Sequence, residues 1–512
     1  MAEAMVESRA TATKDLRVAI IGAGLGGLSA AARLAGAGYD VHVYEKQSGP
    51  GGKAFSEEYG SYRFDTGPSL FTFRNVFDQL FSELGEDLDD YLDLERLDEI
   101  CHYFWNDGTR LISFGDQEAL AAEFEEKLGE PRQNILDFLD YSREIYEITN
   151  KLFLWHSLHE NSTYFSKTFF SSLLRVGKID AFKTMNQSVE RFFQTEKARQ
   201  FFDRYATYNG SDPYQTPATL NIIPFVEYGL GAYAVGDGIY AVPRALEKLA
   251  KKAGAIFHYN TVVDQITWKK RLGGGRIVEG IQIGGLTYEY PIVISNADVT
   301  PTYHRLLDDD TSTPIKRYHD LEPSSSGLVF YWGMGREFPE LGLHNIFFSS
   351  DYKREFREIF QEAKCPTEPT VYVNITSKHS SHDAPAGSEN WFVLINAPYD
   401  DGQNWDEEVK RVRRAVVDRL SYVLEADIEA AIEEEGVMTP ADIQAKTDSH
   451  RGSLYGISSN SRTAAFSRHP NRSRRYRGLY FCGGSAHPGG GMPLVVLSGK
   501  IAADLVRRHG GA

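Results

Sequence analysis

The feature that most constrains the fold is a glycine-rich turn between an apolar run and a helical pattern near the start of the chain. Residues 18–21 (Val-Ala-Ile-Ile) form an unbroken apolar run, typical of a strand buried on both faces. Gly22, Gly24 and Gly27 follow with G-x-G-x-x-G spacing, and small and apolar residues then recur at helical spacing. A second apolar run ends at Glu45. The pattern predicts a strand, a turn, a helix and a second strand in succession.

This arrangement predicts an α/β fold that binds a dinucleotide. One glycine permits the tight turn, one lets the backbone approach a pyrophosphate, and one lets helix and strand pack closely. The N-terminus of the helix then faces the phosphate charge. A carboxylate at the end of the second strand accepts hydrogen bonds from an adenosine ribose, which assigns that role to Glu45. Alone the motif could be an ordinary glycine-rich turn, but its place between the predicted elements favours a dinucleotide site.

Length, charge and cysteine content narrow the class of protein. The 512 residues suffice for about two or three domains with a large core. The net charge of −16 argues against a nucleic-acid partner. Cys101, Cys365 and Cys482 lie far apart, which excludes a disulfide framework and suits a reducing compartment. We find no apolar run long enough to cross a bilayer and no signal-peptide pattern before the first strand.

Two further glycine-rich stretches lie far apart in the sequence. Residues 51–53 (Gly-Gly-Lys) are either an ordinary loop or a second backbone surface against the cofactor. Near the C-terminus, a strand at 479–481 runs into a glycine loop, and Pro493 then begins a helix. The N-terminus of that helix is offered to an electron-rich ring, on which it could stabilise negative charge. Because cofactor-binding patterns lie at both ends of the chain, we expect a discontinuous nucleotide-binding domain with a second domain inserted.

These stretches also carry a family resemblance. Residues 51–53, followed by 62–69 (Tyr-Arg-Phe-Asp-Thr-Gly-Pro-Ser) and 487–493 (His-Pro-Gly-Gly-Gly-Met-Pro), resemble the FAD-dependent carotenoid desaturases of the phytoene-desaturase type. Those enzymes are amine-oxidase-like flavoproteins, and the resemblance runs from Val18 to Val506. It implies a Rossmann-like FAD-binding domain with an inserted α+β substrate domain. The FAD-binding domain would comprise residues 16–75, 235–305 and 468–512, and the substrate and membrane-associating domain residues 76–234 and 306–467.

The resemblance implies FAD as the cofactor and a set of residues that hold it. Val263 would contact the adenine end from a strand over 260–266. Lys53 stands where many relatives carry arginine, which puts a bidentate phosphate contact in doubt. The implied contacts are Gly22, Gly24, Leu25, Gly26, Gly27, Glu45, Lys46, Gly52, Lys53, Gly67, Pro68, Ser69, Val263, Asn296, Gly483, Gly484, Gly491, Met492 and Pro493.

The implied reaction is hydride transfer from a substrate carbon to flavin N5, with alignment of the reacting carbons as the main protein contribution. Residues 64–72 and 100–109 look most like 3,4-desaturases of hydroxylated carotenoids, which predicts a C-3,4 double bond in the acyclic end of a 1-hydroxylated carotenoid. Alternatives in the same class are multistep phytoene desaturation to lycopene or neurosporene and a redox-neutral carotene isomerase. A flavin amine oxidase and a carotenoid-binding or scaffolding protein without flavin are alternatives from other classes.

Two residues are candidate catalytic groups. Glu227 lies beside a glycine-rich turn, although it could be a buried carboxylate at a strand end whose oxygens the backbone satisfies. His487 lies beside the predicted flavin loop, where it could instead shape the turn, and His344 is a weaker candidate on the substrate side. His379, His382 and Asp383 have near metal-ligand spacing, but their serine-rich surroundings are typical of an exposed loop, so we expect no metal.

Residues 151–185 interleave aromatic and basic side chains. This composition suits a segment that rests in a membrane interface, but it also suits a helical substrate domain whose apolar side is core. Because a carotenoid dissolves in membranes, we expect peripheral association with the cytoplasmic side of a membrane, through a local basic patch that the acidic total does not forbid. The electron acceptor, a quinone or oxygen, is left open.

Overall fold

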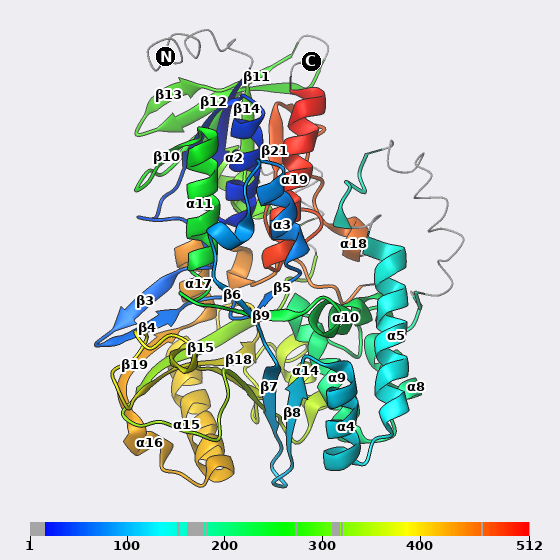
Figure 1. Cartoon of the computed structure of the whole chain (residues 1–512). Helices are drawn as coiled ribbons and strands as arrows, with labels where there is room; N and C mark the ends of the chain where they lie inside the picture. Colours follow the sequence, from blue (N-terminus) through cyan, green and yellow to red (C-terminus); the bar gives the residue numbers. More distant parts are fainter. Residues whose placement is uncertain are drawn as a thin grey trace.

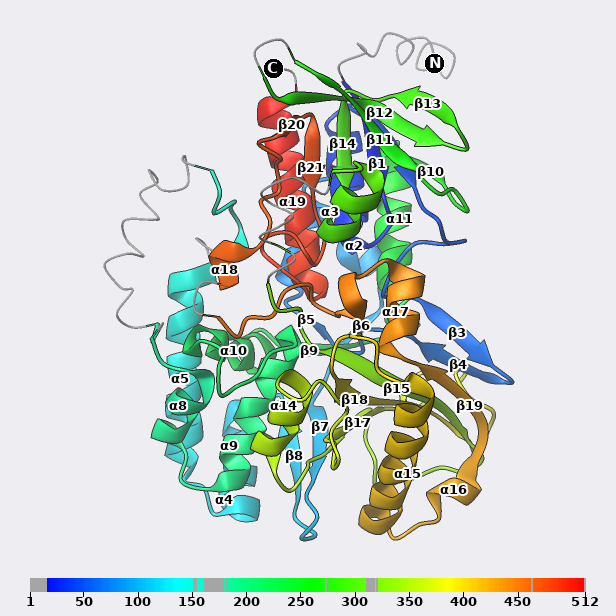
Figure 2. The same ribbon diagram turned by 180° about the vertical axis from the view of Figure 1, so that it is seen from behind.

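The computed structural model describes residues 16–150, 154–160, 179–180, 182–271, 274–309, 318, 321–461 and 464–510. The described chain forms an α/β part that carries both of its ends and a second part built from a larger sheet and a group of helices (Figures 1 and 2). Most of the 151–185 segment lies outside the described residues.

The α/β part is built on a parallel five-stranded sheet. Its strands pair in the order β10-β2-β1-β14-β21, all parallel. They are β1 (Arg17–Ile21), β2 (Asp40–Tyr44), β10 (Ile256–His258), β14 (Ile292–Ser295) and β21 (Leu479–Phe481). The predicted buried strand at 18–21 is confirmed as the centre of this sheet, and so is the α/β class. The exact domain bounds stay a prediction.

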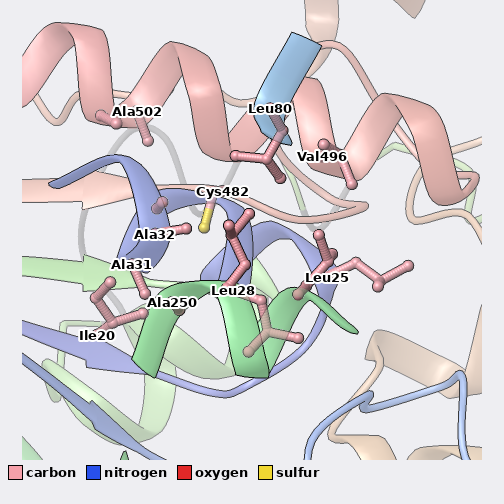
Figure 3. Packing of buried hydrophobic residues seen from close by; sticks show 14 of the residues in the cluster. Ile20, Leu25, Leu28, Ala31, Ala32, Leu80, Ala250, Cys482, Val496 and Ala502 are labelled. Atoms are coloured by element: carbon pink, nitrogen blue, oxygen red, sulfur yellow. The ribbon is translucent and has the colours of Figure 1, made fainter. Parts of the chain in front are cut away.

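Helices cover this sheet on the side shown in Figure 1. Helix α2 (Leu25–Gly36) lies between α11 (Ala241–Ala253) and α19 (Met492–His509), with α3 (Asn75–Ser82) against α19. Figure 3 shows Leu25 and Leu28 of α2 in the same buried cluster as Leu80 of α3 and Val496 of α19. The first and last helices of this part therefore share one core.

Small residues let α2 and α19 approach closely. A Cβ atom added to Gly499 would lie 2.2 Å from the carbonyl oxygen of Gly26. The hydroxyl of Ser29 donates a hydrogen bond to the carbonyl oxygen of Val496 at 2.6 Å. The backbones of α2 and α19 are therefore in direct contact, although the two helices lie far apart in the sequence. A larger side chain at Gly26 or Gly499 would prevent this contact.

The second part contains a seven-stranded sheet in the order β19-β15-β18-β17-β16-β7-β8. The sheet is mixed rather than antiparallel throughout, because β16 pairs with β7 in parallel. The strands are β7 (Glu99–Phe104), β8 (Arg110–Phe114), β15 (Ser326–Met334), β16 (His344–Phe347), β17 (Val371–Asn374), β18 (Glu389–Ala397) and β19 (Ile432–Met438).

Helices pack on and beside this sheet, as the amphipathic patterns predict. The longest, α15 (Trp405–Leu424), buries its apolar side against the sheet in one core cluster. Beside the sheet lie α4 (Gln117–Leu128), α5 (Arg132–Thr149), α8 (Met185–Phe192), α9 (Glu196–Asp203), α10 (Ile222–Tyr228) and α14 (Tyr352–Phe360). No helix among the described residues is long and apolar enough to cross a membrane.

Smaller elements complete both parts. The strands are β3 (Ser56–Tyr59), β4 (Tyr62–Asp65), β5 (Phe71–Thr72), β6 (Leu94–Arg96), β9 (Ala232–Val235), β11 (Gln265–Lys270), β12 (Arg276–Ile283), β13 (Leu286–Glu289) and β20 (Tyr476–Arg477). Of these, β11, β12, β13 and β20 form a separate sheet at the end of the α/β part (Figures 1 and 2). The short helices are α12 (Val299–Pro301), α16 (Ile428–Ala431), α17 (Pro440–Thr447) and α18 (Ala464–Ser467).

The close α2–α19 contact predicts a large effect of one methyl group. We expect Gly499→Ala to destabilise the protein by about 1–3 kcal/mol, because the methyl group must displace backbone. Arg507→Ala, on the exposed side of α19, should change stability by less than about 0.5 kcal/mol. Chemical denaturation of both variants measures this, and equal stabilities would show that the two helices can separate without cost.

Candidate functional site

The glycine turn lies at the carboxyl end of β1, where α2 begins. Gly24 occupies the position before the helix, and no side chain among the described residues caps the first turn of α2. A Cβ atom at Gly27 would lie 2.2 Å from the carbonyl oxygen of Gly22, so this position has room for glycine alone. The helix N-terminus therefore offers backbone N–H groups to an anion, as the sequence pattern predicts.

The Glu45 side chain is hydrogen-bonded to the backbone on both sides of this site. Its carboxylate accepts hydrogen bonds from the backbone N–H groups of Ala23 at 2.7 Å and Gln47 at 2.9 Å. The backbone of Thr261 donates to the carbonyl oxygen of Glu45 at 2.8 Å, which brings the segment around Val263 beside the carboxylate. This is where a ribose and adenine would lie if the predicted roles of Glu45 and Val263 hold.

The predicted strand over 260–266 is wrong in its first half. Asn260 has a φ of +52°, a left-handed conformation that interrupts a strand and that asparagine tolerates better than most residues. Strand β11 begins only at Gln265, so Val263 lies in a loop, where it is buried.

The 51–53 stretch packs its backbone against the turn. The N–H of Gly51 donates to the carbonyl oxygen of Ala23 at 2.9 Å, which builds this stretch onto the glycine turn, and its contact with the cofactor stays a prediction. The Lys53 ammonium donates to the carbonyl oxygens of Ser453 and Leu454 at 2.9 and 2.8 Å, and burial lowers the pKa of Lys53 to about 8. The Lys53 side chain therefore binds the 453–454 segment of the protein and is not free to bind a phosphate.

Lys46 is engaged in the same way. Its ammonium lies 2.9 Å from a carboxylate oxygen of Asp448. Its predicted part in cofactor binding therefore depends on its backbone or on breaking this ion pair.

Asn296 joins the two glycine-rich ends of the chain. It follows β14, and its amide nitrogen lies 3.4 Å from the carbonyl oxygen of Gly22. A Cβ atom on Gly26 or on Gly483 would lie 2.6 or 3.0 Å from its amide oxygen. The predicted cofactor residues at both ends of the sequence thus surround one side chain.

A second helix N-terminus without a side-chain cap begins at the C-terminal glycine loop. Pro493 lies in the first turn of α19, which confirms the predicted helix start. Gly491 precedes it with a φ of +100°, and a Cβ atom there would meet no atom of the described chain within 4 Å. The space in front of this loop is open.

That space belongs to a cavity of about 590 Å³ between the two parts of the molecule. Most of its other walls are apolar side chains from α10, β16, β18 and the 220–226 and 454–455 segments. Of the predicted site residues, the cavity is lined by Gly67, Pro68, Ser69, Glu227, His487, Gly491, Met492 and Pro493. The α2 turn and Glu45 lie outside this lining, so the predicted set divides into a nucleotide region and a cavity region.

Glu227 lies on a helix, so the prediction of a strand end is wrong. Helix α10 packs on α5, where the hydroxyl of Ser142 accepts a hydrogen bond from the N–H of Phe225 at 3.0 Å. The Glu227 carboxylate accepts hydrogen bonds from the hydroxyl groups of Tyr205 and Tyr208, both at 2.7 Å, and lies 3.9 Å from Arg204. Side chains satisfy it, and its catalytic role stays a prediction.

His487 is buried and neutral. Its Nε2 lies 2.9 Å from the carbonyl oxygen of His156, which only accepts, so Nε2 carries the proton. Burial lowers the pKa of His487 to about 3. At neutral pH the Nδ1 atom of His487 can therefore accept a hydrogen bond but carries no proton to donate. A role of His487 in catalysis stays a prediction.

Several polar residues of the cavity wall are not among the predicted site residues, and Tyr372 and Arg468 are two of them. Tyr372 lies between Val371 and Val373, which are buried on the opposite face of β17, and this alternation could have identified it as a cavity residue. Arg468 is buried, and its guanidinium donates hydrogen bonds to the carbonyl oxygen of Tyr455 and to the side-chain oxygen of Asn209. Burial lowers the pKa of Arg468 to about 10. No sequence signal indicates this position.

Of the residues with near metal-ligand spacing, Asp383 is buried and has other partners. Asp383 accepts hydrogen bonds from Arg63 at 3.0 Å and from Thr376 at 2.6 Å. Within the described ranges, no group of three or more histidine, cysteine, aspartate or glutamate side chains could hold a metal ion.

Comparison with solved structures identifies the fold. An oxidoreductase from Methanosarcina mazei is 16% identical, with a TM-score of 0.61 over 95% of this chain and all of that one. A putrescine oxidase variant is 15% identical with a TM-score of 0.61, over 96% of this chain and 99% of that one. A fatty acid isomerase from P. acnes is 16% identical with a TM-score of 0.58, over 97% and 99%. At these identities the likeness is one of fold.

Comparison of sequences identifies the family. Residues 25–507 match the family of flavin containing amine oxidoreductases. A 1-hydroxycarotenoid 3,4-desaturase from Flavobacterium sp. (strain P99-3) is 43% identical over 95% of this chain and 98% of its own length. A 4,4'-diaponeurosporene oxygenase from Staphylococcus aureus (strain USA300) is 33% identical over 96% and 97%. This chain therefore belongs to the flavin-containing amine oxidoreductases, as an FAD-dependent oxidoreductase of the carotenoid desaturase type.

Proposed function

We propose that this protein introduces the C-3,4 double bond into the acyclic end of a 1-hydroxylated carotenoid. The observation that carries the proposal is the apolar cavity of about 590 Å³ in front of the loop that begins α19, in a chain 43% identical to a 1-hydroxycarotenoid 3,4-desaturase. A long apolar substrate fits these walls better than a cationic amine, because the Glu227 carboxylate on the cavity wall is already hydrogen-bonded to two tyrosines and does not replace the water that an amine would lose.

The residues of the chain fit FAD. The N-terminus of α2 and the Glu45 carboxylate would hold the pyrophosphate and ribose, while Asn296 and the glycines around it keep the backbone open to close approach. The loop before α19 would lie against the flavin ring. When bound, FAD supplies the acceptor for the hydride removed from the substrate.

The remaining work falls to the cavity wall. Apolar side chains exclude water and align the polyene, which is the main protein contribution when a carbon next to a conjugated system loses its hydrogen. The new double bond also requires loss of a proton from the carbon next to the one that loses hydride; in this proposal the cavity groups that would accept it are the free Nδ1 of neutral His487 and the Glu227 carboxylate. A quinone or oxygen would reoxidise the flavin.

Products separate this proposal from its alternatives. We expect purified protein with FAD on liposomes to form a 3,4-double bond in a 1-hydroxylated carotenoid, measured by chromatography and absorption spectra. Lycopene or neurosporene from phytoene, a rearranged isomer without net oxidation, a terminally oxygenated carotenoid or oxidation of an amine would each favour a different enzyme. A colourless protein that cannot be reconstituted with FAD would contradict every oxidoreductase function.

The ribose carboxylate gives a second prediction. We expect Glu45→Ala to weaken FAD binding by about 10–100-fold, because hydrogen bonds to a charged group are worth about 1.5–3 kcal/mol. Asp40→Ala removes a half-exposed carboxylate from the start of the same strand and should leave the affinity within about twofold. Titration of the apoproteins with FAD, followed by flavin fluorescence, measures both dissociation constants.

We propose that the protein associates peripherally with the cytoplasmic side of a membrane, through residues 151–185. Two described side chains support this: Phe182 is 82% exposed, and Phe466, which lines the cavity, is 49% exposed. Leu154, Leu158 and Ile179, also within 151–185, line the cavity. The Arg472 guanidinium forms an ion pair with Glu160, and the Arg474 guanidinium donates to the carbonyl oxygen of His159. Because both side chains already have partners within the protein, they are poorly placed to bind lipid headgroups.

Liposome flotation tests this proposal. We expect the double variant Phe169→Asp, Phe170→Asp to bind about tenfold or more weakly, because two aromatic side chains leave the interface and two anions enter it. Tyr422→Asp, at an aromatic residue of α15 that is 70% exposed, is the matched control and should bind like wild type. Equal binding of all three proteins would exclude 151–185 as the membrane contact.

A further inference from the structure

Four residues that line the cavity carry a buried polar atom without a hydrogen-bond partner among the described residues: Arg204, His344, Tyr352 and His487. The Arg204 guanidinium packs over three tyrosine rings beside Glu227, and Tyr352 packs edge-on against Phe348 and Phe356. His487 offers an acceptor on the loop before α19. His344 differs from Arg204 because its ring is neutral, from His487 because its free atom is a donor, and from Tyr352 because its free atom can only donate, whereas a hydroxyl also accepts.

The hydrogen bonds around His344 fix its tautomer. The Asn374 amide nitrogen donates to the carbonyl oxygen of Leu343 at 2.9 Å, which sets the orientation of the amide. The same nitrogen lies 3.2 Å from Nδ1 of His344, and because an amide nitrogen only donates, Nδ1 must accept. In the neutral ring the proton is then on Nε2. This Nε2 is the atom without a partner.

Burial keeps the ring neutral. His344 is 3% exposed, and desolvation lowers the pKa of its imidazole to about 3. A buried N–H donor without a partner is costly, and groups of this kind usually find their partner in a ligand or an ordered water. The same sheet also supplies apolar side chains to the cavity, Ile346 on the same strand and Phe392 and Leu394 on β18.

His344 is linked to the cofactor side of the cavity. Its Nδ1 lies 2.7 Å from the hydroxyl of Tyr372, which lies 2.6 Å from the hydroxyl of Ser69. A Cβ atom on Gly67, two residues before Ser69, would lie 2.0 Å from the carbonyl oxygen of Lys53. Lys53 in turn bonds to the 453–454 carbonyl oxygens, and Tyr455 packs on Gly490 of the loop before α19. A continuous wall therefore joins His344 to that loop.

We propose that His344 is a specificity-determining residue whose Nε2–H donates a hydrogen bond to the C-1 hydroxyl oxygen of the carotenoid. The inference rests on the proposed function. A single carbon, C-2, separates C-1 from C-3, so a bond to this hydroxyl fixes the position of the carbons that react. An end without the hydroxyl would leave a buried donor unpaired, and such sites discriminate strongly against the analogue that lacks the group.

The test compares one hydroxylated and one otherwise identical non-hydroxylated acyclic carotenoid, both in liposomes with FAD-loaded enzyme. We expect wild type to favour the hydroxylated carotenoid in kcat/KM, and His344→Phe to reduce this preference about tenfold or more, mainly through the KM of the hydroxylated carotenoid. His344→Gln, which keeps an N–H donor, should recover part of the preference. Ile346→Ala removes apolar volume from the same strand and should change both substrates in the same proportion.

The ratio of the two kcat/KM values does not depend on the folded fraction, so a partly unstable variant still reports on specificity. Flavin absorbance of each variant shows how much enzyme is loaded, and His344→Leu replaces His344→Phe if the larger ring prevents loading. An unchanged preference in the apolar variant overturns the role of His344 and leaves the proposed function intact. A wild type that makes no 3,4-double bond, or that has no preference for the hydroxyl, overturns both.

Discussion

The close packing of α2 on α19 is the contact on which the rest of the structure depends. Gly26 and Gly499 bring the two helices to backbone contact, and Ser29 adds a hydrogen bond across the interface. Through Asn296 the same region joins the glycine turn to Gly483 at the other end of the chain. Two uncapped helix N-termini are thereby held in one domain, one at the nucleotide turn and one at the cavity.

The cavity arises where this domain meets the larger sheet. One wall is built from the 67–69 and 490–494 segments, and the facing wall from β16, β17, β18 and α10. His344 on β16 and Tyr372 on β17 join the two walls, because Tyr372 is hydrogen-bonded to both His344 and Ser69. The Glu227 carboxylate is held by two tyrosine hydroxyl groups, and the Arg204 guanidinium, which keeps an unpartnered Nε–H, packs over tyrosine rings. His344 instead presents a neutral N–H donor without a partner among the described residues, which is the group that we propose selects the substrate.

Several features could be predicted because they rest on local sequence. Strand β1, the start of α2 and the start of α19 follow from apolar periodicity, glycine spacing and the place of Pro493. Other predictions failed where tertiary contacts or a single backbone conformation decided. Residues 222–228 are a helix because they pack on α5, and the strand expected at 260–266 is shortened by the left-handed Asn260. A short apolar run does not distinguish helix from strand by itself.

By itself, the sequence determined the α/β class, the dinucleotide turn and the family, because glycine spacing and strand periodicity are local properties that a chain displays before it folds. Only the tertiary structure decided which polar residues share the cavity. Ser69, Tyr372 and His344 lie far apart in the sequence, and their hydrogen bonds exist because β16, β17 and the 67–69 loop come together in space. It also showed that Lys53 binds two carbonyl oxygens, since a side chain's partner depends on which segments fold beside it.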